Sequence, residues 1–243
     1  MDRYGRGVLG ALLALGIVLS TVVGSRALVR VKSEDQTIMV TGSAKRRIRS
    51  DLIVWTATAS GKGDTMQAAY KELAKATPKV TAYLAEKGVA AAEIQVDSIV
   101  TKPLHAHDKQ GRELEESVVG YSMSQTIEVR SHDVERVAQV SRAATELINQ
   151  GIMLESNAPE YHYTKLGELK IEMLSDAAHD TRVRAEHIAT ATKAKLGALR
   201  SARMGVMQIN PADSTETSSE GNNDVTALDK DVIAVVTSNF QLE

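Results

Sequence analysis

Residues 118–130 read VVGYSMSQTIEVR, and this stretch decides the fold class. Its side chains alternate between two faces, a period of two that predicts a β-strand with one buried face. The residues that share the predicted buried face are Tyr121, Met123, Gln125, Ile127 and Val129. Further strands and helices are predicted on both sides of this stretch.

Strand signals recur along the chain. β-Branched residues concentrate in residues 36–43 (QTIMVTGS) and 52–60 (LIVWTATAS), and the basic residues 45–49 between them are expected to form an exposed hairpin connection. Later segments with the same character are 94–102, 152–155, 159–165, 199–209 and 229–242. The polar segments 104–116 and 211–227 are expected to be a hairpin tip and a loop.

Three segments carry helical periodicity, with apolar residues at spacings of three and four. They are 64–88, with Asp64 as N-cap and Gly88 as C-cap, 134–149, with Asp133 as N-cap and Gly151 as stop, and 166–196, with Gly197 as stop. Pro78 predicts a kink or a break in the first helix, and Ile148 belongs to the predicted buried stripe of the second. Because pairs of strands separate the helices, the order predicts an α+β fold: a mixed, largely antiparallel sheet with helices packed on one face.

An apolar run, GVLGALLALGIVLSTVVG, occupies residues 7–24 and contains no charged residue. As a helix it reaches about 27 Å, enough for a hydrocarbon core. We expect one N-terminal transmembrane helix, with residues 1–32 as a signal-anchor and 33–243 as an extracytoplasmic domain. The expected anchor residues are Val8, Leu12, Leu15, Val18 and Val22. A cleaved signal peptide and a buried soluble helix are the alternatives.

The charges around this run do not fix its orientation. Arg3 and Arg6 precede it, but Arg26, Arg30 and Lys32 follow it, and a count of basic residues alone would leave the domain in the cytoplasm. Long domains cross membranes with little regard to such charges, so the count is weak evidence.

Composition excludes several classes of function. The formal net charge is -2 and aromatic residues make up 3% of the chain, which gives no basis for nucleic-acid binding. The absence of cysteine excludes disulfides, thiolate catalysis and Cys-ligated metals. The sequence contains no P-loop, G-x-S-x-G or H-E-x-x-H motif. We therefore expect no enzyme activity, no cofactor, and no catalytic or metal-binding residue.

Four groups of side chains were weighed as exceptions. His105, His107 and Asp108 could form a metal site or a solvated turn, and His162 could be a proton shuttle or a half-buried strand residue. His179 and His187 are too far apart on a helix to chelate one ion. The basic residues Lys45, Arg46, Arg47 and Arg49 could contact anionic lipid or be solvated. We expect a solvated turn at 105–108, a half-buried strand residue at His162, a charged helix surface around His179 and His187, and a solvated hairpin at 45–49.

Several stretches together resemble the SIMPL-domain family over roughly residues 36–242. They are VTGSA at 40–44 followed by Asp51, GYSMSQ at 120–125, AAHDTRVRAEHIA at 177–189, LGAL at 196–199, MGVMQI at 204–209 and KDVIAVV at 230–236. The resemblance implies an envelope location and ring-like oligomers. It supplies no agreed catalytic residue and no agreed ligand.

We therefore expect a homo-oligomeric, ring-like scaffold anchored in the bacterial inner membrane, with its C-terminal domain in the periplasm and a link to envelope or oxidative stress. The expected interface is formed by Arg182, Arg184 and Glu186, beside the small residues Ala178, Ala185 and Ala189. Two alternatives stay open. One is a monomeric module that binds a peptide, glycan, membrane or envelope protein through loops 104–116 and 211–227. The other is a hydrolase, which a pocket joining His162 to two carboxylates would favour.

Overall fold

The computed structural model describes residues 16–18, 20–25 and 36–243. These residues form an α+β fold with antiparallel strand pairs and two separate sheets. The chain divides into two compact units. The α4 unit contains the described residues up to Lys45, together with Lys170–Met207 and Ile233–Glu243, and the α2 unit contains Arg46–Leu169 and Gln208–Val232.

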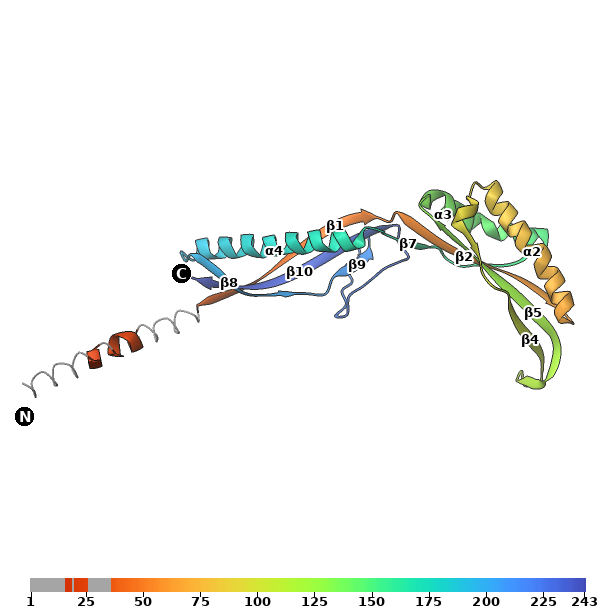
Figure 1. The fold of residues 1–243 in the computed structure, drawn as a ribbon, viewed down its shortest axis with the longest axis horizontal. Helices are drawn as coiled ribbons and strands as arrows, with labels where there is room; N and C mark the ends of the chain where they lie inside the picture. The colour runs from red at the N-terminus through yellow and green to blue at the C-terminus, as the bar shows by residue number, and fades with distance from the viewer. Residues whose placement is uncertain (1–15, 19, 26–35) are drawn as a thin grey trace, which may run out of the picture. The chain divides into compact units, whose positions relative to one another are not determined.

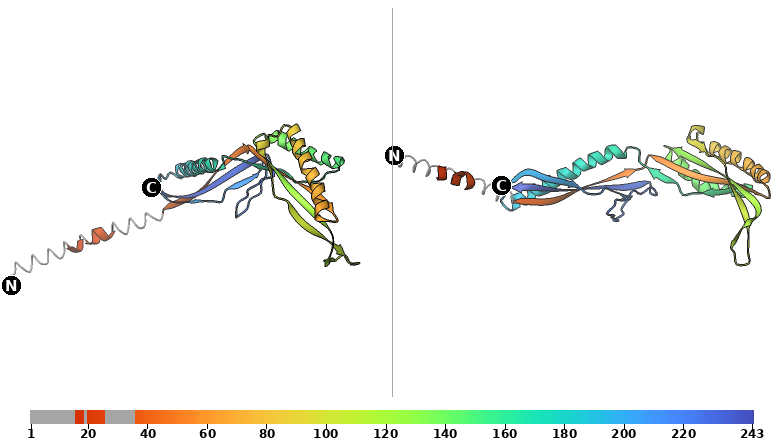
Figure 2. Two further views of the ribbon diagram at one scale, coloured as in Figure 1. Left: turned by 45° about the vertical axis from the view of Figure 1, so that its right-hand side comes forward. Right: turned by 60° about the horizontal axis from the view of Figure 1, so that its bottom comes forward.

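The sheet of the α4 unit has the order β1 (Thr37–Arg49), β10 (Asp229–Leu242), β8 (Leu196–Met204), and β9 (Gln208–Pro211) also pairs with β10. Helix α4 (Leu166–Ala191) runs alongside β1 and β10 in all the views of Figures 1 and 2. Its buried residues recur at every fourth position, which places them on the face toward the sheet. They are Leu169, Met173, Ala177, Thr181, Ala185 and Ala189.

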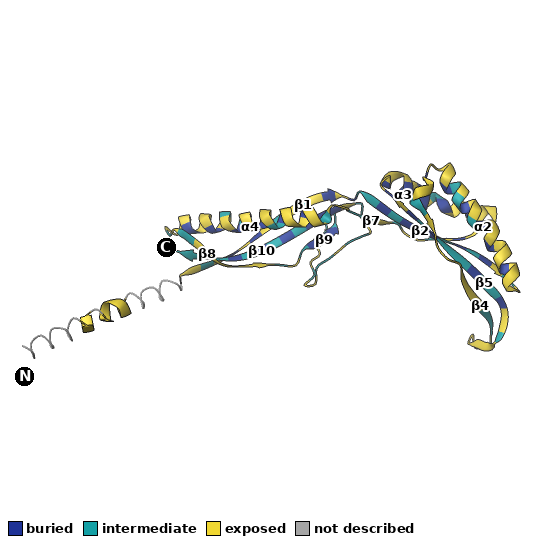
Figure 3. Cartoon of the chain, in the orientation of Figure 1, coloured by how far each residue is buried: buried dark blue, intermediate teal, exposed yellow. Residues whose placement is uncertain are grey.

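The sheet of the α2 unit has the order β3 (Ile94–Val96), β5 (Glu113–Ser131), β2 (Leu52–Gly63), β6 (Met153–Ser156). Strand β4 (Val100–His107) pairs with β5, and β7 (Glu160–His162) pairs with β2. Helix α2 (Met66–Glu86), the short 3-10 helix η1 (Ala91–Glu93), helix α3 (Val134–Ala143) and the 3-10 helix η2 (Ala144–Gln150) complete the unit. Figure 3 shows buried residues on both α2 and β2, and Trp55 of β2 and Leu73 of α2 belong to one buried core.

The prediction of a single sheet is wrong, and so is the hairpin between the first two strands. β1 pairs with β10 in one sheet, whereas β2 pairs with β5, β6 and β7 in the other. The basic residues 45–49 are not a turn, because β1 continues through them to Arg49. Exposed and less exposed residues alternate along all of β1, so Lys45, Arg47 and Arg49 occupy outward positions while Ile48 is buried.

The helices are where the sequence predicts them, with three corrections. Thr65 rather than Asp64 caps α2, since its Oγ1 accepts a hydrogen bond from the Ala68 amide at 3.2 Å. α2 is continuous through Pro78. α4 ends at Ala191 rather than Leu196, because Lys193 adopts a positive φ of 58° that stops the helix.

The second predicted helix is confirmed at both of its ends but not in between. Asp133 caps it by accepting a hydrogen bond from the Arg136 amide at 3.2 Å, and Gly151, with φ at 77°, stops it. After Ala143, however, the chain continues as the 3-10 helix η2. With about three residues per turn instead of 3.6, the predicted apolar stripe loses its register, and Ile148 is exposed rather than buried.

Two predicted strands are divided in the structure. Residues 94–102 are split between β3 and β4, and residues 199–209 between β8 and β9. β4 and β5 also continue into the predicted hairpin tip, so the turn covers only residues 108–112. Asp108 organises this turn, since its Oδ1 accepts hydrogen bonds from the amides of Gln110 and Arg112.

The described part of the amino terminus, residues 16–18 and 20–25, is helical and exposed, and it includes Val18 and Val22 of the predicted anchor. The anchor residues Val8, Leu12 and Leu15 lie outside the described residues. Within the described ranges, no helix combines the length and the apolar character that crossing a membrane requires.

Candidate functional site

Strand β10 begins with two adjacent charged residues, Lys230 and Asp231. Neighbouring residues of a strand point to opposite faces, yet Lys230 is only 2% exposed and Asp231 is fully buried. A buried charge needs a partner of opposite charge and hydrogen bonds. The α2 unit therefore has to supply partners on both sides of this strand.

On one side, the Lys230 ammonium connects β7 to the loop before β10. Its Nζ donates hydrogen bonds to the carbonyl of Tyr161 at 2.6 Å and to the carbonyl of Asp224, and it lies 3.8 Å from the Asp224 carboxylate. The Asp224 carboxylate also accepts hydrogen bonds from Thr226 and from the Ala227 amide. Burial lowers the pKa of Lys230, and the negative charge of Asp224 opposes that effect only in part.

The pKa of Asp224 shows the reverse balance. Burial alone would raise it, but the hydrogen bonds from Thr226 and Ala227 and the charge of Lys230 hold it below its ordinary value. Asp224 is therefore a carboxylate, and its oxygens are used within the loop.

On the other side of β10, the Asp231 carboxylate receives a fork of hydrogen bonds from Arg47, from Nε at 2.9 Å and from Nη2 at 3.1 Å. It also accepts a hydrogen bond from the Asp213 amide at 2.9 Å. Arg49 forms ion pairs with Glu135 and with Asp229. Arg47 and Arg49, both considered for lipid contact, are thus paired inside the unit.

A cavity of about 90 Å³ lies beside Lys230. It is lined by Ile48, Tyr161, His162, Tyr163, Leu166, Ile209, Asn223, Asp224, Val225 and Lys230. His162 Nε2 lies 3.1 Å from the Glu160 carboxylate, but Glu160 does not line the cavity. The cavity thus contains His162 with one carboxylate rather than the two that a hydrolase would favour, and that carboxylate already serves the loop.

The other histidines do not form a metal site. In β4, the Nδ1 atom of His105 is buried without a hydrogen-bond partner, His107 is exposed, and Asp108 belongs to the turn. His179 and His187 are exposed on α4. Across the part of the chain that the structure describes, no group of three or more His, Asp or Glu side chains could hold a metal ion.

The predicted interface residues are exposed on α4 and paired within the helix. Arg182 Nε lies 2.9 Å from Glu186, and Arg184 Nε lies 2.7 Å from Asp180, both at the i,i+4 spacing. The small residues behave differently from the prediction. Ala178 is exposed, but Ala185 and Ala189 are buried against the protein's own sheet, because they belong to the row of every fourth residue. They cannot bring a second copy close.

Two of the stretches that resemble the family, residues 40–44 and 177–189, meet in the α4 unit. A Cβ atom on Gly42 would lie 2.4 Å from the Thr181 backbone nitrogen and 2.7 Å from the Ala177 oxygen, so only glycine lets α4 approach β1 this closely. The Ser43 amide donates a hydrogen bond to Asp180 at 2.8 Å, and this bond is the main reason that the pKa of Asp180 is lowered. The buried hydroxyl of Thr181 bonds to Ser238 of β10 at 3.2 Å.

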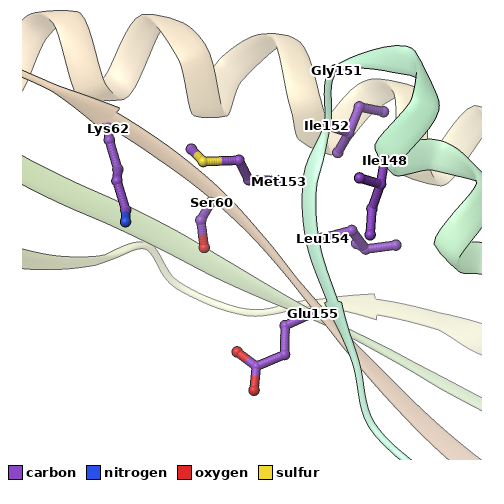
Figure 4. A pocket seen from close by; sticks show the side chains of 8 residues that line it. All are labelled: Ser60, Lys62, Ile148, Gly151, Ile152, Met153, Leu154 and Glu155. Carbon is purple, nitrogen blue, oxygen red and sulfur yellow. The ribbon is translucent and has the colours of Figure 1, made fainter.

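A groove of about 420 Å³ lies at the edge of the other sheet, beside β6 (Figure 4). Its apolar lining comes from Ile148, Ile152, Met153 and Leu154, and Ser60, Lys62, Gly151 and Glu155 complete it. This volume falls within the range of about 300–1,000 Å³ that small-ligand sites occupy. The sequence did not indicate this groove, because Ile148 was expected in the core.

The family model described as "SIMPL: Protein of unknown function (DUF541)" matches residues 38–240, a range that runs from β1 into β10 and contains residues of both units. No curated protein matches the chain.

Proposed function

The chain belongs to the SIMPL family, and from this premise we propose that it is a non-catalytic scaffold that assembles with copies of itself at a membrane. The family is one of unknown function, so the proposal depends on surfaces of this chain. The copies form a ring on the periplasmic side of a bacterial inner membrane, held there by the apolar run 7–24. The resemblance to the SIMPL-domain family also suggests a role in envelope or oxidative stress, and we include that role in the proposal.

The observation that carries the proposal is the exposure of β8. This strand ends the path β1-β10-β8, and all of its residues from Ala198 to Met204 are exposed, including Leu199 at 55% and Met204 at 62%. An edge strand with apolar side chains exposed is a template for another chain. A second copy of the protein would cover it.

The charged face of α4 would fix the register of such a contact. Arg182, Arg184 and Glu186 are exposed beside Ile188, which is also exposed. Reciprocal pairing of mixed charges between identical neighbours selects one orientation. An anchor confines the copies to a plane and raises their effective concentration, so weak contacts suffice for assembly.

The test is the mass of the intact protein, solubilised in detergent, by size-exclusion chromatography with light scattering. The scaffold predicts one defined assembly of several copies, which Leu199→Arg reduces to smaller species without a change in thermal midpoint. Lys79→Glu on α2 is an exposed control that should leave the mass unchanged. A wild-type monomer, in detergent and in membranes, would remove the scaffold proposal.

Anchoring and orientation need separate measurements. If residues 7–24 are an uncleaved anchor, carbonate washing leaves the protein in the membrane fraction and its intact mass includes residues 1–24. A mature terminus near Ser25 or Leu28 would instead indicate a cleaved signal peptide. Protease added to spheroplasts should digest a periplasmic domain, and complete protection would place it on the cytoplasmic side.

A further inference from the structure

The groove beside β6 lies at an open edge of the sheet in the α2 unit. β6 pairs with β2 only over Ala57–Ser60, while β2 continues to Gly63. No other described strand pairs with β6. Open strand edges leave backbone donors and acceptors that an extended peptide can use.

The groove has an apolar centre. Figure 4 shows Met153 between the end of β2 and β6, with Ile148 and Leu154 on the other side of the β6 ribbon. Met153 is 44% exposed and Ile148 is 52% exposed, so both offer apolar surface to a ligand. A flexible thioether adapts to apolar side chains of different shapes.

The two ends of the groove carry opposite charges. Glu155 lies opposite Thr58 of β2, and Lys62 is four residues further along the same strand. At about 3.3 Å per residue, this separation along the strand is about 13 Å. Neither Lys62 nor Glu155 forms an ion pair with another described residue.

We propose that this groove binds a short, extended apolar peptide of about four residues, with its free carboxylate at Lys62 and its free ammonium at Glu155. Four extended residues span about 13 Å, which matches the separation of the Lys62 and Glu155 positions along the strand. The site goes beyond the proposed scaffold and does not depend on assembly of the copies.

The direction that the charges impose agrees with the sheet. A peptide with its amino end at Glu155 and its carboxylate at Lys62 runs in the same direction as β2. Since β6 is antiparallel to β2, the peptide is antiparallel to β6 and can continue the antiparallel pattern of this edge. Charge and backbone pairing therefore favour the same orientation.

The experiment is isothermal titration of the full-length protein in detergent with the tetrapeptide Ala-Leu-Val-Ala. The free peptide should bind, and N-acetylation or C-amidation should each weaken binding about three- to fivefold, the range for a partly exposed ion pair. Lys62→Gln should abolish the effect of amidation alone, and Glu155→Gln the effect of acetylation alone. Lys79→Gln, an exposed lysine on α2, should change neither.

Ile148→Lys tests the apolar part of the groove and should abolish binding, with an unchanged thermal midpoint because Ile148 is exposed. Undiminished binding to a folded Ile148→Lys variant would overturn the site, as would equal affinity for free and doubly blocked peptides. If no peptide binds and Ile148→Lys instead reduces the assembly mass, the occupant is a second copy and the peptide proposal is wrong. Light scattering on the same samples separates these results from a failure of the scaffold.

Discussion

Replacing Lys230 by methionine should strongly destabilise the α2 unit. Methionine retains most of the side-chain volume but removes the ammonium. The carbonyls of Tyr161 and Asp224 then lose the hydrogen bonds from Nζ, and the Asp224 carboxylate loses the ammonium that lies 3.8 Å away. The substitution therefore separates the hydrogen bonds of Lys230 from its packing.

The magnitude follows from two opposing effects. Each buried acceptor left unpaired costs about 1–3 kcal/mol, so two carbonyls give about 2–6 kcal/mol. The lowered pKa of Lys230 indicates that burial disfavours its charge. Removing that charge therefore offsets part of the loss in the free energy of unfolding. We expect a net loss of about 3 kcal/mol, and Lys75→Met, which breaks only an exposed pair with Glu72, should cost less than about 1 kcal/mol.

The assay is urea unfolding of the detergent-solubilised protein, followed by tryptophan fluorescence. Trp55 is the only tryptophan in the sequence, it is fully buried, and it belongs to the same unit as Lys230. The pH dependence gives a second readout. Because the folded pKa is below 10.5, the unfolded chain binds more protons between the two values, and wild-type stability gains from this group as pH rises through that window.

Lys230→Met lacks this gain, so the difference in the free energy of unfolding between the wild-type protein and the variant should increase as the pH rises toward 10. A loss below about 1 kcal/mol at neutral pH, comparable to that of Lys75→Met, would refute the reasoning. It would mean that water replaces the ammonium as donor in the adjoining cavity.

Three further predictions concern the α4 unit and Asp51. Arg184→Glu should reduce the assembly mass without unfolding the domain, because it places a second negative charge beside Asp180 on an exposed face; an unchanged mass at low and high salt would exclude this face as the interface. Asp51→Asn should cost about 1 kcal/mol at pH 7 in a urea titration. The pKa of Asp51 is lowered because hydrogen bonds from Thr164 outweigh the effect of burial, so this difference should shrink below pH 3.8, as the folded carboxylate is protonated. Gly42→Ala should lower the free energy of unfolding, measured by calorimetry, by about 2 kcal/mol, because its Cβ would overlap the α4 backbone. Gly167→Ala, which has open space around it, should leave the free energy of unfolding unchanged.

Local signals predicted most of the elements, but not how the strands are distributed between sheets. Alternation and helical spacing depend on residues a few positions apart, so the strands and helices appear close to their expected places. Pairing of β1 with β10 depends on residues almost 200 positions apart, for example Thr41 and Thr237, whose hydroxyls lie 3.0 Å from each other. The hairpin prediction failed because the basic residues looked like a turn, although the buried Ile48 continues the alternation.

The candidate sites were harder to predict for the same reason. Lys230 and Asp231 stood out only within a stretch that resembles the family, and hydropathy gives a Lys-Asp pair no reason to be buried. The partner of the Asp231 carboxylate is Arg47, 184 positions away, and the Lys230 ammonium bonds to the carbonyl of Tyr161, 69 positions away. The groove depends on η2, where a change from α-helical to 3-10 geometry turns Ile148 outward.

The stretches that carried the resemblance to the family contain packing contacts of the fold, but they do not contain the residues of the groove beside β6. Gly42, Ser43, Asp180 and Thr181 hold α4 against β1. Gly120 has a similar role in the α2 unit, since a Cβ there would lie 2.9 Å from the Gly63 oxygen. These contacts pack one element of the fold against another, and the fold requires them whichever ligand the protein binds. The groove residues Lys62, Ile148, Met153 and Glu155 lie within the 38–240 match but outside the stretches that carried the resemblance, and a family of unknown function assigns them no ligand. A ligand of this groove therefore has to be sought with this chain itself.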